Sequence, residues 1–352
     1  MGKNRIAFLD GYRGIAIFLV ILFHTYSRWN DVLPYNHDYS NFFIFKYGFL
    51  GVELFFLISG FVILMTLEKA VTFKEFLTKR WLRLFPAMLI ASIIIFISSN
   101  IFKTWPDGTP QVTNIIPGLL FIDPQWINNI FKSNLASLDG SFWSLYVEVK
   151  FYIVFGIAYF TLGRNKAIAL ISIASVLWFV CHFADLILAR KILSLFSFNY
   201  FGWFSAGALA YTYYTSKSKI FLFNSISMGL ISCLLFINDL YEIIGAIFIY
   251  VLFVLPILMK SVQRIIANKF FLFLGVISYP LYLVHQYLLI ALIKLYHNYF
   301  IILPDLILPI PALIIIVLLA VLITRFLEPT IKNLFVRKIY TPRLIKSITV
   351  KS

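Results

Sequence analysis

Charged residues are scarce in this chain. Asp, Glu, Lys and Arg make up 13% of its 352 residues, whereas 61% are hydrophobic and 18% are aromatic. A water-soluble protein of this length needs many more surface charges, so the mean hydropathy of +0.90 excludes that class and predicts a polytopic membrane protein. The net charge of +15 would suggest nucleic acid in a soluble protein; here we attribute it to topology and expect no nucleic-acid partner.

Cysteine and histidine are also few. Cys181 and Cys233 fall within apolar stretches, which excludes a disulfide framework, and we expect both to pack. The five histidines and the acids within apolar stretches have no spacing typical of metal ligands, so we expect no metal. No cleavable signal, internal repeat or soluble domain is visible. The chemistry must therefore be carried out by membrane spans and short loops.

Apolar stretches long enough to cross ~30 Å of hydrocarbon recur along the chain. We expect an all-α integral membrane protein whose ten spans form one bundle. The expected spans are roughly residues 13–29, 47–67, 85–101, 146–162, 167–184, 198–214, 220–237, 241–259, 271–296 and 310–327. We expect residues 1–335 to form this membrane domain and residues 336–352 to form a basic cytoplasmic tail.

Basic residues are sorted to one side of these spans. All but eight of the 30 Lys and Arg lie on the side of the N-terminus. The exceptions are Arg28, Lys46, Lys103, Lys132, Lys150, Arg190, Lys191 and Lys294. Because Lys and Arg accumulate in cytoplasmic loops, this sorting predicts that both termini are cytoplasmic.

The first span, "RGIAIFLVILFH", carries an arginine and a histidine. Arg13 and His24 are eleven residues apart, so they share one helical face about 16 Å apart along the axis. Arg13 alone would be a positive-inside anchor, and His24 alone could be an interhelical hydrogen-bonding residue. Ionisable groups within a membrane usually mark a pathway or an active site, so the pair on one face favours a functional site. Asp10, three residues before Arg13, could hold its guanidinium group.

A basic cluster precedes the third span in "TKRWLRLFP". Lys79, Arg80 and Arg83 lie there, and we expect Pro86 in the first turn of the new helix. Arg80 and Arg83 share a helical face, and paired guanidinium groups suit phosphate recognition. Topology, or binding of anionic lipid headgroups, would explain the same cluster.

Acids and polar groups also occur within later apolar stretches. Glu53 in "GVELFFLISGF" and Glu148 in "FWSLYVEVKFY" each need a partner at membrane depth, and either could orient His24. A structural ion pair is the alternative for each. In "ISYPLYLVHQ", the ninth span places Ser278, Tyr282 and His285 on one face, which favours a polar path, with Pro280 loosening the helix.

Six motifs in this order resemble the membrane acyltransferase-3 family. They are "LDGYRGIA" with the Arg-to-His spacing, "GVELFFLISGF", "KRWLRLFP", "FWSLYVEVKFY", "SYPLYLVH" and "FLEP", and the resemblance covers about residues 5–330. It implies an integral membrane O-acyltransferase with ten spans, both termini cytoplasmic, an acyl-CoA donor, most often acetyl-CoA, and a glycan or lipid-linked sugar as acceptor. The source would then be bacterial and the location the inner membrane.

Carried onto this sequence, the resemblance assigns roles to single residues. Arg13, Arg80 and Arg83, with Asp10 supporting Arg13, would hold the CoA phosphates, and His24 would be the general base or a transient acyl carrier. Glu53 or Glu148 would orient the imidazole. The candidate substrate path comprises Trp143, Ser144, Tyr279, Tyr282 and His285.

The sequence departs from the family pattern in one site residue. The second-span acid, expected as Asp, is Glu53, which leaves the partner of His24 open. We expect no C-terminal extracellular hydrolase-like domain of the kind some relatives carry, so further acceptor handling would need another protein. A transporter or flippase, with His24, Glu53, Glu148 and His285 lining a path, is the alternative function, and a succinyl or longer acyl group is the alternative donor.

Overall fold

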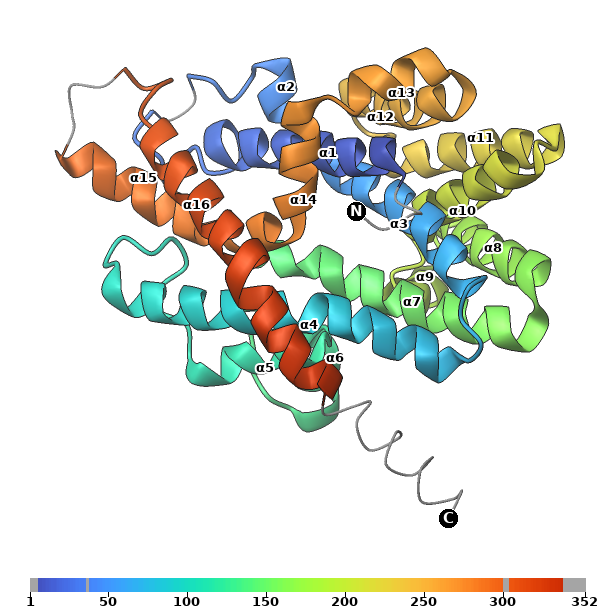
Figure 1. Cartoon of the computed structure of the whole chain (residues 1–352), viewed down its shortest axis with the longest axis horizontal. Helices are drawn as coiled ribbons and strands as arrows, with labels where there is room; N and C mark the ends of the chain where they lie inside the picture. The colour runs from blue at the N-terminus through green and yellow to red at the C-terminus, as the bar shows by residue number, and fades with distance from the viewer. Residues whose placement is uncertain (1–5, 36–37, 300–303, 338–352) are drawn as a thin grey trace. The chain divides into compact units, whose positions relative to one another are not determined.

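The computed structural model describes residues 6–35, 38–299 and 304–337. Within these ranges the chain is helical and contains no strand, as the composition predicts. Figure 1 shows the helices coloured along the chain. They form two compact units: unit 1 comprises Met1–Phe76 and Trp143–Ser278, and unit 2 comprises Leu77–Phe142 and Tyr279–Ser352. The division of the chain into a membrane domain at residues 1–335 and a tail at residues 336–352 stays a prediction. Most of the expected basic tail, residues 338–352, lies outside the described residues.

Unit 1 holds most of the long helices. In chain order they are α1 (Ala7–Tyr26), α2 (Phe43–Lys46), η1 (Gly48–Leu50), α3 (Gly51–Leu67), α7 (Trp143–Leu162), α8 (Arg164–Phe183), α9 (Ile187–Leu195), α10 (Phe201–Ser216), α11 (Lys219–Cys233), η4 (Leu234–Phe236), α12 (Leu240–Leu258), α13 (Lys260–Ile266) and most of α14 (Lys269–Val284). Cys181 and Cys233 are free and buried here, so the expectation that they pack is confirmed.

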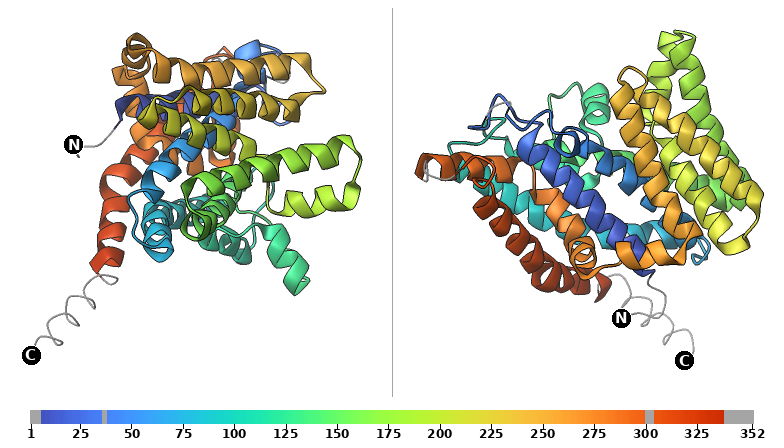
Figure 2. Two further views of the ribbon diagram at one scale, coloured as in Figure 1. Left: turned by 90° about the vertical axis from the view of Figure 1, so that its right-hand side faces the viewer. Right: turned by 90° about the horizontal axis from the view of Figure 1, so that it is seen from above.

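Helix α10 forms the centre of unit 1. It packs against α3, α8 and α11 (Figure 2), and every residue from Phe201 to Thr212 is buried. Its small residues permit this close packing. A Cβ atom at Gly207 would lie 2.0 Å from the backbone oxygen of Leu57 on α3, so no larger residue fits. Small residues at helix contacts are typical of membrane bundles, where van der Waals packing drives association.

Unit 2 combines one long helix with several short ones. Most of α4 (Phe73–Ile101) belongs to it, followed by η2 (Val112–Asn114), α5 (Ile115–Leu120), α6 (Pro124–Phe131), η3 (Gly140–Phe142), the end of α14, α15 (Tyr287–Tyr299), α16 (Ile310–Leu322) and the π-helical turn η5 (Ile323–Leu327). The short elements between α4 and α7 correspond to the expected long outer connection.

Among the described residues, eight helices are long and apolar enough to cross a membrane, or nine if one bent pair counts as a span. The eight are Ala7–Tyr26, Gly48–Leu67, Phe73–Ile101, Gly140–Leu162, Arg164–Phe183, Lys219–Phe236, Leu240–Leu258 and Ile310–Arg337. The bent pair is α13 and α14, which meet at 68°. The chain is therefore a multi-pass helical membrane protein.

Two of the ten expected spans differ from uninterrupted membrane helices. The sixth, residues 198–214, corresponds to α10, which has only 16 residues and is largely buried within unit 1. The ninth, residues 271–296, is wrong as one helix, because α14 ends at Val284 and α15 begins at Tyr287. His285 thus lies in a break between two helices. Apolar residues lie on both sides of this two-residue break, which is why hydropathy averaged over a window does not reveal it.

The expected start of the third span is also wrong. Pro86 was expected in the first turn, but α4 begins at Phe73 and Pro86 lies inside it. The basic segment before Pro86 is therefore helical and continuous with the span. A proline inside a helix removes one backbone hydrogen bond, which the surrounding helix tolerates here.

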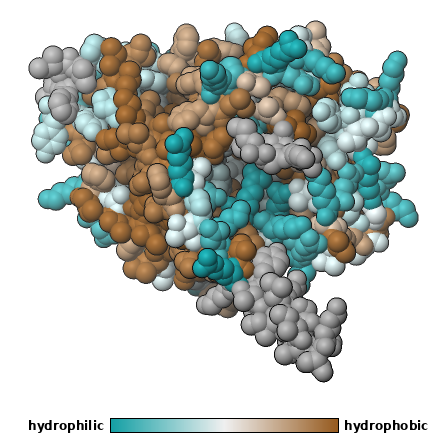
Figure 3. Space-filling view, viewed as in Figure 1, coloured by the Kyte–Doolittle hydropathy of each residue, from teal (hydrophilic) through white to brown (hydrophobic). Residues whose placement is uncertain are grey.

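The outer surface of α16 is apolar. Ile314, Leu318 and Leu322, spaced by four residues, are 54%, 61% and 46% exposed. Apolar side chains cover this helix in the left part of Figure 3. An exposed apolar stripe of this length is expected of a helix that faces lipid.

Candidate functional site

Arg13 and Asp10 form an ion pair in the first half of α1. Arg13 Nη1 lies 2.8 Å from Asp10 Oδ1, and the Asp10 side chain is buried. The contact predicted from the three-residue spacing is therefore present. The pair is supported by α14: a Cβ atom at Gly275 would lie 1.8 Å from the backbone oxygen of Asp10, so only glycine permits this approach.

His24 lies in the last turn of α1 and is half-buried. Its Nδ1 is 2.9 Å from the backbone oxygen of Val20. A carbonyl oxygen only accepts, so this contact assigns the proton of the neutral ring to Nδ1 and the basic lone pair to Nε2. The backbone of its own helix thus fixes the tautomer of His24, a function that the sequence analysis gave to Glu53 or Glu148.

Glu148 on α7 is held by two hydroxyl groups. Ser59 Oγ on α3 donates to Glu148 Oε1 at 2.6 Å, and Tyr152 Oη, one turn along α7, donates to the same oxygen at 2.5 Å. The structure thus supplies hydroxyl partners for an acid that needs them at membrane depth.

Glu53 on α3 is in a different environment. Its side chain is only 4% exposed, and its Oε2 has no hydrogen-bond partner among the residues that the structure describes. A buried oxygen without a partner costs free energy, so it is a candidate for contact with a bound molecule or water. Its assignment as a partner of His24 stays a prediction.

The two arginines of the basic cluster lie in unit 2, in the half of α4 that we expect to face the cytoplasm. Arg80 is 7% exposed and Arg83 is half-buried, while the neighbouring Lys79 is exposed. Arg83 interacts electrostatically with Glu328, the acid of the "FLEP" motif. A buried guanidinium group at the end of a span is unusual for a simple topology signal, because such anchors reach toward water.

A second polar cluster in unit 2 surrounds the break between α14 and α15. His285 is fully buried, and its Nδ1 lies 2.7 Å from the backbone oxygen of Tyr282. Tyr282 Oη donates to the backbone oxygen of Ser141 at 3.1 Å. Asp139 accepts from the Ser141 backbone NH at 2.8 Å, from Ser141 Oγ at 2.7 Å and from the Tyr287 backbone NH at 3.1 Å.

Asp139 is the member of this cluster that the sequence analysis missed. Burial raises the pKa of Asp139 to about 6, although hydrogen bonds from Ser141 and Tyr287 act in the opposite direction. The signal in the sequence is weak: an Asp before Gly-Ser in "SLDGSFWS" indicates a capping turn but not burial. Through these hydrogen bonds Asp139 stabilises the start of α15 and the short helix η3.

The remaining residues of the expected path lie in both units. In unit 1, Trp143 at the start of α7 is 39% exposed and its ring lies edge-on to Phe56, and Ser144 is buried. In unit 2, Tyr279 Oη donates to the backbone oxygen of Leu84 at 2.9 Å, which ties the end of α14 to α4. Tyr279 therefore has a structural contact whatever its role in a path.

A small polar pocket lies in unit 2, among the segments that follow α4 and α6 and beside Tyr287 at the start of α15. Its volume is about 170 Å³, and its polar lining includes Asp107, Asn114 and Asn134. Tyr287 Oη donates to Asp107 Oδ2 at 3.1 Å, and Trp105 lies edge-on to the Tyr287 ring. Amide and carboxylate groups of this kind can donate to and accept from adjacent hydroxyl groups of one ligand.

The arrangement of the described side chains also bears on the binding of metal ions. Within residues 6–35, 38–299 and 304–337, no group of three or more His, Cys, Asp and Glu side chains is placed to hold a metal ion.

Comparison with known proteins agrees with the motifs. Two Staphylococcus aureus proteins named O-acetyltransferase OatA, from strains NCTC 8325 / PS 47 and COL, are each 28% identical over 170 residues, which is 45% of this chain and 25% of each relative. A protein from strain N315 is 28% identical over 166 residues, 44% of this chain and 24% of its own length.

The chain thus spans about a quarter of the length of the curated relatives it matches. No solved structure matches it. The acyltransferase-3 family, described as an acyltransferase domain, matches residues 6–326, nearly the whole chain. The resemblance found in the six motifs is confirmed: this protein belongs to the acyltransferase-3 family.

Proposed function

We propose that the protein is a membrane O-acyltransferase that moves an acetyl group from cytoplasmic acetyl-CoA to a hydroxyl group of a cell-surface or lipid-linked glycan in the inner membrane of a bacterium. The family match and the multi-pass helical fold support this class of reaction. The observation that carries the proposal is the geometry of His24, a half-buried imidazole whose Nδ1 is engaged by Val20.

The chemistry assigned to His24 is general-base catalysis. Nε2 takes the proton of the acceptor hydroxyl as its oxygen attacks the thioester carbonyl of acetyl-CoA. The carbon–sulfur bond breaks, the new ester forms, and the CoA thiolate takes the proton from the imidazolium. Proton transfer by a positioned side chain contributes roughly 10²–10⁴-fold to a rate.

Arg80 and Arg83 are assigned to the phosphate groups of CoA. Planar guanidinium groups bind phosphate oxygens through two parallel hydrogen bonds, and burial of Arg80 strengthens such contacts. Arg13, whose guanidinium group is positioned by Asp10, is assigned to the same ligand. Glu148 and Glu53 remain candidates for orienting groups near the reacting atoms.

The acceptor is assigned to the polar pocket of unit 2. Its volume of about 170 Å³ suits a single sugar ring better than a larger molecule, and its amide and carboxylate groups suit hydroxyl groups. On the expected topology, this pocket faces the outside of the membrane. Asn134→Ala should therefore raise the KM for the acceptor without changing the KM for acetyl-CoA.

The deciding experiment measures transfer of label from acetyl-CoA in membrane vesicles. His24→Ala should reduce kcat at least 100-fold with little change in the KM for acetyl-CoA. The matched control is His182→Ala, which removes a histidine on α8 of the same unit that contacts Arg190. Full transfer by His24→Ala would overturn the assignment of His24.

Two further outcomes separate related mechanisms. Label bound covalently to the wild-type protein without acceptor, and lost in His24→Ala, would indicate an acetyl-imidazole in place of general-base catalysis. If neither the wild-type protein nor any variant consumes acetyl-CoA, yet His24→Ala stops export of a glycan, the protein is a transporter and the acyltransferase proposal is wrong.

A further inference from the structure

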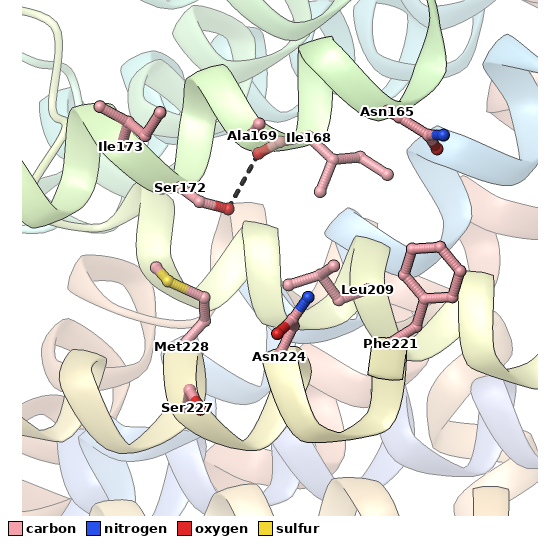
Figure 4. Close-up of a pocket in the computed structure, with 10 residues that line it drawn as sticks. All are labelled: Asn165, Ile168, Ala169, Ser172, Ile173, Leu209, Phe221, Asn224, Ser227 and Met228. Atoms are coloured by element: carbon pink, nitrogen blue, oxygen red, sulfur yellow. Dashed lines mark hydrogen bonds between the residues drawn. The ribbon is translucent and has the colours of Figure 1, made fainter. Parts of the chain in front are cut away.

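A groove in unit 1 is lined by none of the residues assigned above. It has a volume of about 320 Å³ and lies between α8 and α11, with α10 as its floor (Figure 4). Ile168, Leu209 and Phe221 give it an apolar lining. In Figure 4, Asn165 and Phe221 lie at one end, and Asn224 points from α11 into the space between the helices.

The groove opens toward the surface that these helices turn to the membrane. In the apolar stretch of α8 that is long enough to cross a membrane, only 33% of the residues are buried, and in that of α11 only 28% are buried. Ala169, which lines the groove, is itself exposed, and Ile173 at its far end is 57% exposed. Both helices are candidate spans, so the occupant reaches the groove from the bilayer.

The groove also contains polar groups that lack protein partners. Ser172 is paired with Ser205 and with its own helix. In contrast, the side chains of Asn165 and Asn224 make no hydrogen bond to any residue that the structure describes. An amide beside hydrocarbon is costly unless it is hydrogen-bonded, so the half-buried Asn224 indicates an occupant with oxygen atoms, and the exposed Asn165 can donate to the same occupant at the end of the groove.

The same end is basic. Helix α8 begins at Arg164 and α11 begins at Lys219, so the groove's Asn165 end lies beside Lys166 and Lys219, both exposed. Arg164 is already paired with Glu68 at 3.2 Å. Neither lysine forms an ion pair with a described residue, and the expected topology places this end at the cytoplasmic face.

We propose that the groove binds one anionic phospholipid of the cytoplasmic leaflet. One acyl chain lies along the apolar lining, the ester oxygens accept hydrogen bonds from Asn165 and Asn224, and the phosphate lies near Lys166 and Lys219. Each lysine near an anionic headgroup contributes about fivefold in affinity. The proposal does not depend on acyl transfer.

The test uses the purified full-length chain in detergent and measures lipid binding by native mass spectrometry. Phosphatidylglycerol and phosphatidylcholine with identical acyl chains are the two probes. The wild-type protein should prefer phosphatidylglycerol by about 25-fold, and Lys166→Gln with Lys219→Gln should bring the two affinities together. Lys260→Gln with Lys269→Gln, two exposed lysines on α13 and α14, is the control and should keep the preference.

A second variant tests the groove itself. Ala169→Trp should fill the space and reduce binding of both lipids at least tenfold, whereas Ile247→Trp, at an exposed apolar position on α12, should not. Equal binding of the two lipids by the wild-type protein, or an unchanged preference in the double-lysine variant, would overturn the proposal. So would wild-type lipid binding by a folded Ala169→Trp protein.

Discussion

Ser59 on α3 and Glu148 on α7 are joined by a hydrogen bond of 2.6 Å, in which the hydroxyl group donates to the carboxylate. Tyr152 donates to the same oxygen, so one carboxylate joins two membrane helices of unit 1 through two hydroxyl groups. The two hydroxyl groups give the carboxylate of Glu148 hydrogen-bond partners within an apolar stretch, and no ion pair forms among these three residues. It also means that Glu148 has a structural function in addition to any function in orienting reactive groups.

The first prediction concerns the stability of this network. Ser59→Ala and Tyr152→Phe should each destabilise the protein by about 1 kcal/mol, the usual net value of one hydrogen bond. The double variant should cost more than the sum, because the carboxylate then loses both donors. Thermal unfolding in detergent measures all three. Tyr159→Phe on the same helix is the control; a loss of stability as large as that of Tyr152→Phe would contradict this prediction.

The second prediction separates ligand binding from topology in the basic cluster. Arg80→Gln should raise the KM for acetyl-CoA by roughly 10- to 100-fold with little change in kcat, because a lost charge-assisted hydrogen bond costs roughly 1.5–3 kcal/mol. Arg80→Lys should restore only part of the lost affinity for acetyl-CoA, since lysine lacks the planar guanidinium group that forms two parallel hydrogen bonds. Steady-state kinetics in vesicles measures each KM.

The exposed neighbour Lys79 provides the control for this prediction. Lys79→Gln removes the same charge from the same helix one residue away. The KM of the Lys79→Gln variant for acetyl-CoA should stay near the wild-type value. An equal rise in both variants would mean that the cluster acts through membrane topology or lipid attraction, not through contact with CoA.

How much the sequence can predict is clearest in the first helix. The spacing of Asp10 and Arg13 predicts their ion pair, since residues three apart share a helical face, and the pair is present. The same rule places Arg13 and His24 on one face. The tautomer of His24, however, depends on a backbone contact with Val20 that periodicity does not reveal.

The features that the sequence did not predict depend on contacts between distant residues. Asp139 accepts a hydrogen bond from the backbone of Tyr287, 148 positions along the chain, and so stabilises the helix that begins there. No local pattern carries that information. The continuous α4 through Pro86 and the break at His285 were missed for a related reason, because hydropathy measures burial in lipid and not the course of the backbone.

The third prediction concerns the support of Asp10 by α14. Gly275→Ala would place a methyl group 1.8 Å from the Asp10 backbone oxygen, so α1 and α14 would have to separate. We expect a loss of stability of about 1–3 kcal/mol, typical of overpacking, and a raised KM for acetyl-CoA as Arg13 shifts. Gly118→Ala is the control, because a Cβ atom there meets only ordinary contacts at 3.4 Å. Wild-type stability in Gly275→Ala would show that the two helices are not in close contact.

The last prediction concerns the pH dependence of stability that Asp139 contributes. Burial raises the pKa of this carboxyl group from 3.8 to about 6 in the folded protein. A raised pKa means that the folded state favours the protonated form. The contribution of Asp139 to stability is therefore fully present below about pH 4 and is lost as the pH rises through about 6.

Asp139→Asn provides the measurement, because asparagine stays neutral at every pH and keeps one oxygen to accept from Ser141. The melting temperature of the wild-type protein, relative to that of Asp139→Asn, should fall as the pH rises from about 4 to about 7. Asp123→Asn, at the cap of the surface helix α6, is the matched control for removal of a capping carboxylate. A difference between wild type and Asp139→Asn that grows in favour of the wild type over this range would mean that the hydrogen bonds from Ser141 and Tyr287 outweigh burial, and that Asp139 is ionised in the folded protein.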